Sequence, residues 1–208
     1  MRLYEYISNK DEVMDRANDP DLDRALTMLE KDCQKFIKET GGFLFRATDR
    51  RLGDVIKKMK QREDRRPLNT KKYIHALADT AFQKSFGWKA RTDALFTSTH
   101  PSQTRGYGSN MYLVFPIGNY KYIWSDEISD FFIKQSGMES VKQRVYPYTA
   151  KLDQDDMDSL MPEYTDKNLK KAWADRESRE VMLNCPNGYY YVNTLMIGEL
   201  SHYLNIER

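Results

Sequence analysis

Residues 180–193 have the sequence EVMLNCPNGYYYVN, in which two short apolar and aromatic runs flank a turn-forming segment. Runs of this kind, bounded by asparagine, proline and glycine, predict two strands separated by a turn. Similar segments occur earlier in the chain, and they are FLFRA (43–47), ALFTST (94–99), MYLVFPIG (111–118) and YKYIW (120–124). We therefore expect a sheet built from short strands.

Helical periodicity dominates the start of the chain, which we expect to form an N-terminal helical region (1–40). Apolar residues recur there at spacings of three and four, which places them on one helix face. These residues are Leu22, Leu26, Leu29, Cys33, Phe36 and Ile37. The glycine pair at 41–42 should end the helix. The same pattern predicts a helix over 72–86, and the basic residues 50–66 are expected to form another that ends at Pro67.

The order of these elements indicates the fold class. Helices come first, short strands follow, and residues 128–173 are expected to be largely helical and irregular, so the sequence predicts an α+β fold rather than a doubly wound parallel sheet. The sequence contains no GxGxxG or GxxxxGK[ST] motif, which excludes the ordinary Rossmann and phosphate-loop nucleotide sites. At 208 residues the chain is expected to form a single domain, 1–208.

The composition indicates a globular protein, since 40% of the residues are hydrophobic and 31% are charged. No uncharged run approaches the ~18 residues of a membrane span, and the N-terminus lacks an export signal. We therefore expect a cytoplasmic protein with no membrane partner. Cys33 and Cys185 fit no metal-ligand spacing, and neither His75 nor His202 is expected to bind a metal.

Charge is distributed unevenly along the chain, although the net charge is only +2. Residues 50–72 are strongly basic, whereas residues 151–167 are acidic. Two interpretations stay open. The two segments are solvated faces of helices, or the basic one is a surface beside the active site that binds RNA or DNA.

Three segments place a polar residue within or at the start of an apolar strand. They are LFRATD with Arg46, LFTST with Ser98, and EVML, which begins at Glu180. Their order along the chain resembles that of the mono-ADP-ribosyltransferases of the Arg, Ser-Thr-Ser, Glu class. A glycine-bearing loop after Ser98, and a proline-glycine turn with an aromatic strand after Glu180, strengthen the resemblance.

The resemblance implies a core of two small mixed or antiparallel sheets preceded by helices, and NAD as the substrate. Cleavage of the nicotinamide–ribose bond passes through an oxocarbenium-like cation, which the carboxylate of Glu180 would stabilise. The planar fork of donors on Arg46 would bind the pyrophosphate. By the same resemblance, Ser98 would orient Glu180 through a hydrogen bond.

The resemblance also assigns roles to residues around Ser98. Thr99 would support the edge of the strand, Arg105 would contact a phosphate, and Tyr107 would present its ring to nicotinamide. No metal is expected to take part.

The chain departs from the family at the position two residues before the catalytic glutamate. Members that modify arginine carry a second glutamate there, whereas this chain has Ser178, which disfavours an arginine acceptor. Glu177 lies one residue out of register and would point to the opposite face of a strand. His100 stands where the third residue of the Ser-Thr-Ser pattern would be.

The spacing between the motifs also differs from the family. Ser98 and Glu180 are 82 positions apart (180 minus 98), so we expect residues 129–176 to be an insertion that covers the site or binds a partner. If this interpretation is wrong, Asp126 or Glu127 is the rival catalytic carboxylate.

The leading hypothesis is therefore an enzyme that transfers ADP-ribose from NAD to a macromolecule. Ser178 and the basic run 50–72 favour a nucleic-acid acceptor over a protein. The resemblance further suggests a bacterial or phage toxin or effector, with a neutralising antitoxin as a partner. Two alternatives remain: a non-catalytic module on the same fold that binds RNA or a protein, and an NAD glycohydrolase that uses water as the acceptor.

Overall fold

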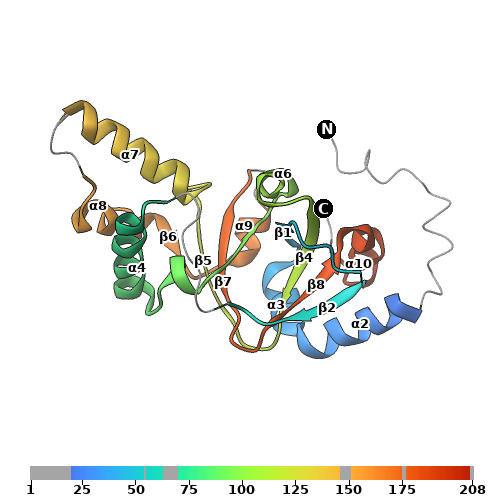
Figure 1. Cartoon of the computed structure of the whole chain (residues 1–208). Coiled ribbons are helices and arrows are strands. Elements are labelled where there is room, and N and C mark those ends of the chain that lie inside the picture. Colours follow the sequence, from blue (N-terminus) through green and yellow to red (C-terminus); the bar gives the residue numbers. More distant parts are fainter. Residues whose placement is uncertain (1–19, 54, 63–69, 146–150, 175–176, 207–208) are drawn as a thin grey trace.

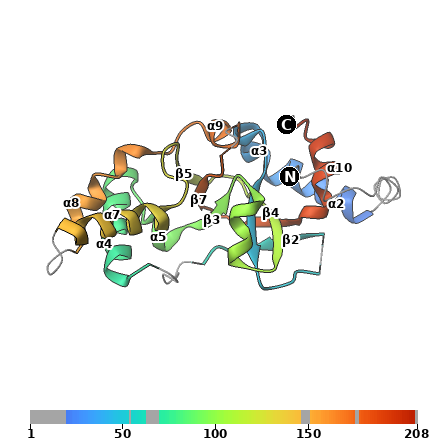
Figure 2. The same cartoon turned by 90° about the horizontal axis from the view of Figure 1, so that it is seen from above.

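The strands of this protein form one antiparallel sheet with helices packed at both of its ends (Figures 1 and 2). The computed structural model describes residues 20–53, 55–62, 70–145, 151–174 and 177–206. The strands are β1 (Leu44–Thr48), β2 (Ile56–Met59), β3 (Leu95–Ser98), β4 (Asn110–Pro116), β5 (Lys121–Ser125), β6 (Tyr164–Thr165), β7 (Glu180–Asn184) and β8 (Tyr189–Asn193). This mixture of helices with an antiparallel sheet agrees with the α+β class expected from the sequence.

The helices precede, interrupt and follow these strands. They are α2 (Pro20–Asp32), α3 (Gln34–Thr40), α4 (Lys72–Phe86), α5 (Ala90–Asp93), α6 (Pro101–Thr104), α7 (Phe131–Val145), α8 (Gln154–Asp158), α9 (Leu169–Ala174) and α10 (Ile197–Tyr203), with the 3-10 turns η2 (Arg105–Tyr107), η3 (Met161–Glu163) and η4 (Thr194–Met196). None of the helices within the described ranges is long and apolar enough to cross a membrane.

The sheet has the strand order β2-β8-β4-β1-β3-β7-β5-β6, and every neighbouring pair is antiparallel. The expectation of two small sheets is wrong, because β1 and β3 join two groups of strands into one. The junction is short, since its register consists of the single pair Phe45 and Ser98. It brings β1, β3 and β7, which carry the polar residues singled out in the sequence, to the middle of the sheet.

Two hydrophobic cores hold helices against the sheet. The first includes Leu29 of α2, Phe36 of α3 and Leu200 of α10, packed with residues of β1, β4 and β8. The second includes Phe82 of α4 and Phe131 of α7, packed with residues of β5 and β7. Full burial of one such side chain stabilises the fold by about 1.5–3 kcal/mol. In Figures 1 and 2 the two groups of helices lie at opposite ends of the molecule.

The predicted helices at 1–40 and 72–86 are confirmed where the structure describes them, whereas residues 1–19 lie outside the described part. The apolar face predicted for the first helix is buried, and the chain breaks it into α2 and α3 at Cys33. Gly41 ends α3 in the left-handed conformation, with φ of 60°, as expected for a glycine at this position.

The basic helix predicted over 50–66 is wrong, because β2 occupies its middle. Ile56 pairs with Val192 and Met59 pairs with Tyr189, so this segment adds a strand to the edge of the sheet beside β8. Pairing across the sheet outweighs the local preference of the sequence for helix. Residues 54 and 63–69, which include the proposed end at Pro67, lie outside the described part of the chain.

Residues 129–176, expected to be an insertion, contribute α7, α8, α9 and β6, and β6 pairs with β5. Several acidic side chains of this region form ion pairs. Lys142 lies 2.8 Å from Asp153 and 2.5 Å from Asp156, and Lys84 lies 2.6 Å from Asp158. Hydrogen bonds from these lysines lower the pKa of the Asp153 and Asp158 carboxyls. These three aspartates therefore belong to an ion-paired part of the helical layer.

Candidate functional site

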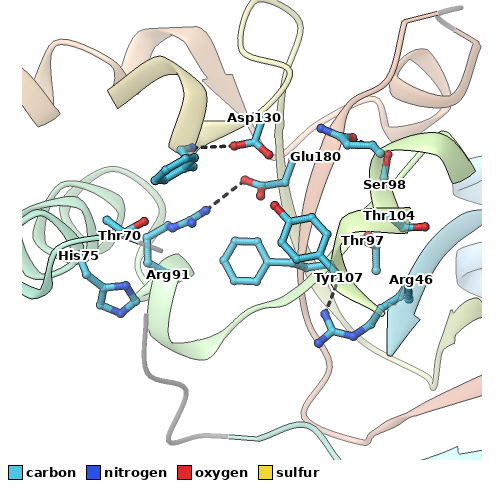
Figure 3. Close-up of a pocket in the computed structure, with 14 residues that line it drawn as sticks. Arg46, Thr70, His75, Arg91, Thr97, Ser98, Thr104, Tyr107, Asp130 and Glu180 are labelled. Carbon is cyan, nitrogen blue, oxygen red and sulfur yellow. Dashed lines mark hydrogen bonds and ion pairs between the residues drawn. The ribbon is translucent and has the colours of Figure 1, made fainter. Parts of the chain in front are cut away.

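Glu180 and Ser98 lie side by side because β3 and β7 pair in register. Ser98, at the end of β3, is the register partner of Glu180, at the start of β7. Both side chains line a pocket of about 240 Å³, together with Arg46 of β1 and Tyr107 of η2 (Figure 3). Four residues singled out in the sequence thus come from four different elements and meet in one cavity.

Arg91 is the cation that contacts Glu180. Its Nη1 donates to Oε1 of Glu180 at 3.1 Å, and the two side chains are only 11% and 14% exposed. The guanidinium also lies over the rings of Phe96 and Phe131, at 4.3 and 4.5 Å from their centroids. The positive charge of Arg91 thus compensates the negative charge of the glutamate in a partly buried site.

Asp79 fixes the short helix that carries Arg91. One carboxylate oxygen, Oδ1, accepts from the backbone N–H groups of Arg91 and Thr92 at 2.8 and 3.1 Å, and Oδ2 accepts from the Thr92 hydroxyl at 2.5 Å. Nε2 of His75 lies 3.4 Å from Oδ2 of Asp79. The sequence analysis did not identify these contacts of Asp79. The pattern that could have indicated them is the spacing of four residues, which places His75 and Asp79 on one face of α4.

Arg46 reaches across the junction of the two strand groups. Its Nη1 donates to the backbone carbonyl of Phe96 at 2.6 Å. Within the described ranges, Nε of Arg46 is buried without a hydrogen-bond partner, and so is Nε of Arg91. Both side chains line the pocket, so two guanidinium groups give it positive charge.

Ser98 belongs to a hydroxyl cluster with Ser178 and Gln103. Oε1 of Gln103 accepts from Ser98 at 2.6 Å and from Ser178 at 2.7 Å, and the two hydroxyl oxygens are 3.1 Å apart. Nε2 of Gln103 donates to the Ser129 carbonyl at 2.9 Å, which fixes the orientation of its amide. Ser98 therefore donates to Gln103, and the contact that orients Glu180 at Oε1 comes from Arg91 instead.

The other predicted cofactor-binding residues lie at different places. Thr99 is buried and outside the pocket lining, and its hydroxyl accepts from the backbone N–H of Arg179 at 3.0 Å. It therefore ties the end of β3 to the residue before β7. Arg105 is exposed on η2 and does not line the pocket. Nδ1 of His100 accepts from the Ser102 N–H at 3.2 Å and so caps α6.

The two rival carboxylates do not line this pocket. Asp126 forms an ion pair with Lys171, and Glu127 is exposed. A third carboxylate in the same stretch, that of Asp130, does line it. Sequence analysis missed Asp130, because only its position before a helix marked it as a capping residue.

No group of three or more metal-binding side chains occurs in the described ranges of the chain. The two cysteines are free and buried, and burial raises the pKa of each thiol to about 12. Neither thiol is a nucleophile at neutral pH, since the thiolate is the reactive form.

Comparisons with known proteins assign no family to this chain. No protein-family model matches the chain, and neither the curated proteins nor the solved structures contain a significant match.

Proposed function

We propose that the protein is an NAD-dependent mono-ADP-ribosyltransferase whose catalytic carboxylate is Glu180. The observation that carries the proposal is the meeting of Glu180, Ser98 and Arg46 in one pocket, although 134 positions (180 minus 46) separate the first from the last. Arg91, which pairs with Glu180, supports it further. A glutamate that only exposed its charge to solvent at the start of a strand would need neither a pocket nor a buried ion-pair partner.

The residues of the pocket suit the substrate. The guanidinium of Arg46, which lines the pocket, would bind the pyrophosphate, since guanidinium groups bind phosphate oxygens strongly. The rings of Tyr107 and Phe132 line the same cavity and offer a surface for a flat heterocycle such as nicotinamide. Glu180, oriented by its contact with Arg91, would stabilise the ribosyl cation as the glycosidic bond breaks.

The acceptor is proposed to be nucleic acid rather than protein. Ser178, which donates to Gln103 as Ser98 does, is neutral, whereas arginine-modifying members of the resembled family have a carboxylate at this position. Several basic residues of the run 50–72 are exposed in its described part: Arg50, Arg51, Lys58, Lys60 and Arg62. Exposed basic residues favour a polyanionic partner.

The test is incubation of the purified protein with labelled NAD and a cell extract, beside Glu180→Gln. We expect the variant to release nicotinamide at least ~100-fold more slowly, because the charge that stabilises the transition state is lost. NAD should still raise the melting temperature of the variant, since a ligand bound by the native state stabilises it. Glu177→Gln is the matched control, because this glutamate is exposed and lies outside the pocket lining.

The destination of the label decides among the alternatives. Label removed only by nuclease indicates a nucleic-acid acceptor, and label removed only by protease indicates a protein. Free ADP-ribose alone indicates a glycohydrolase. If the wild-type protein releases no nicotinamide in any extract, the proposal is wrong and a non-catalytic binding module takes its place.

A further inference from the structure

A second carboxylate, that of Asp130, lies in the same pocket as Glu180. The backbone N–H of Glu180 donates to the carbonyl of Ser129 at 3.0 Å, which holds the neighbouring residue, Asp130, beside the start of β7. Asp130 is only 8% exposed and lines the pocket. Figure 3 shows its carboxylate next to that of Glu180, on the side away from Arg46.

A buried tyrosine, Tyr164, lies within the field of these charges. Burial is the main reason that the pKa of Tyr164 is well above its ordinary value. The negative charges of Glu180 and Asp130 raise it further, whereas the positive charge of Arg91 lowers it. The two carboxylates and the arginine line the same pocket.

The two oxygens of Asp130 have different surroundings. Oδ1 accepts from the backbone N–H groups of Phe132 and Ile133 at 2.7 and 3.3 Å, so it caps the N-terminus of α7. Within the described ranges, Oδ2 makes no hydrogen bond and no ion pair. The cap fixes the carboxylate in place while one of its oxygens stays available to the pocket.

The two carboxylates also differ in their charge partners. Glu180 is compensated by Arg91, whereas Asp130 has no ion-pair partner among the described residues. Two carboxylates placed in different environments take different roles in glycosyl transfer. One stabilises the oxocarbenium-like carbon, and the other takes the proton of the incoming nucleophile.

We propose that Asp130 is the general base of the transfer step, acting on an acceptor that carries a hydroxyl or an uncharged N–H. This inference rests on the proposed function. The bond between ribose C1 and the nicotinamide nitrogen breaks, and nicotinamide leaves with the electron pair. A lone pair of the acceptor forms the new bond to C1, and the acceptor's proton passes to Oδ2 of Asp130.

The test uses competing small nucleophiles, so it needs no knowledge of the natural acceptor. The wild-type protein and Asp130→Asn are incubated with NAD in a mixture of methanol and azide, and the methyl and azido products are quantified. Methanol must lose a proton as it attacks, whereas azide has none to lose. Because general-base catalysis contributes about 10²–10⁴-fold, we expect the methyl-to-azido product ratio to fall about 100-fold in Asp130→Asn.

The variants are chosen to separate catalysis from folding. Asparagine caps a helix as well as aspartate does, so Asp130→Asn should melt near the wild-type temperature. If it does not fold, Asp130→Ser, which also retains a capping oxygen, is measured instead. Glu127→Gln removes the same charge three residues earlier, at an exposed position outside the pocket lining, and should leave the product ratio unchanged.

Each result decides the question. A ratio that falls in Asp130→Asn but not in Glu127→Gln, because less methyl product forms, supports the base. A ratio that falls only because more azido product forms overturns it, since the lost negative charge then explains the change. An unchanged ratio, with nicotinamide release still dependent on Glu180, overturns the role of Asp130 and leaves the transferase proposal intact. A ratio that falls equally in both variants overturns it too, since a general charge effect then explains the change. No nicotinamide release by the wild-type protein overturns both proposals.

Discussion

At the scale of single residues, the ion pair of Arg91 and Glu180 affects both the stability of the fold and the position of the proposed catalytic carboxylate. Both side chains are almost buried, and removal of one partner from a buried pair typically costs about 3–5 kcal/mol, because the other charge is left uncompensated. The packing of Arg91 between Phe96 and Phe131 restricts where its guanidinium can go. The arginine is therefore a positioning residue for the carboxylate.

A double-mutant cycle tests this role. We expect Arg91→Met to lower the free energy of unfolding in urea by about 3 kcal/mol and to slow nicotinamide release about 100-fold. In the Glu180→Gln background the same substitution should cost clearly less, because the charge that needed compensation is gone. Equal costs in both backgrounds would mean that the two residues act independently. Arg144→Met, at an exposed position of α7, is the control for loss of an arginine.

The sequence allowed prediction of the pocket residues that lie in strands. It did not indicate the pocket residues that come from helices and reach the site only through tertiary packing. Arg46, Ser98 and Glu180 stood out because each is polar within or at the start of an apolar strand. Arg91 comes from a helix of one turn, and Asp130 from a helix N-terminus. Nothing local in the sequence indicates that α5 and α7 meet at β7, because side chains distant in sequence determine that packing.

At the scale of elements, the strands could be predicted but their partners could not. β7 and β8 are separated by one turn, yet β7 pairs with β3 and β5, whereas β8 pairs with β2 and β4. Alternating or continuous apolar patterns show that a segment is a strand. They do not show which strand lies next to it, so the two expected sheets proved to be one.

The loop between η2 and β4 depends on close approach of Gly108 to β1. A Cβ at this position would collide with the backbone of Thr48, whereas a Cβ at Gly106 would meet nothing within 4 Å. We expect Gly108→Ala to lower the free energy of unfolding by about 1–3 kcal/mol, as overpacking does. It should also raise the KM for NAD, because Tyr107 moves with the loop.

Gly106→Ala is the matched control for this prediction, since it adds the same methyl group to the same loop. Thermal unfolding and the initial rate of nicotinamide release should be unchanged in it. If Gly108→Ala also leaves the stability and the KM for NAD unchanged, the loop accommodates the added methyl group and the predicted collision with Thr48 is wrong.

At the scale of the whole molecule, the pocket lies where two separately packed ends of one sheet meet. The first core holds α2, α3 and α10, and the second holds α4, α7 and α8. Arg46 comes from the first group of strands, whereas Ser98 and Glu180 come from the second. Relative movement of the two groups would change the distance between the proposed phosphate-binding and catalytic side chains, so the site requires a rigid junction.

The cysteines offer a direct measure of that rigidity, because both lie in the first core. Cys33 and Cys185 are 0% and 1% exposed, and burial raises the pKa of each thiol to about 12. Only on the order of 10⁻⁴ of each thiol is ionised at pH 8, so a disulfide reagent should not label the native protein within minutes. In increasing urea, both thiols should become reactive at the midpoint of global unfolding.

The same raised pKa values predict a loss of stability in alkali. A buried neutral thiol contributes stability that is fully present below the unfolded-state pKa, about 8.5, and is lost progressively as the pH rises toward 12. The free energy of unfolding is measured in urea for the wild-type protein and for the double variant Cys33→Ala/Cys185→Ala. Below pH ~8 it should depend on pH in the same way in both proteins. Above it the wild-type free energy of unfolding should fall more steeply. Rapid labelling of either thiol in the native protein at pH 8 would instead show that the first core opens locally, and that the junction beneath Arg46 is not rigid.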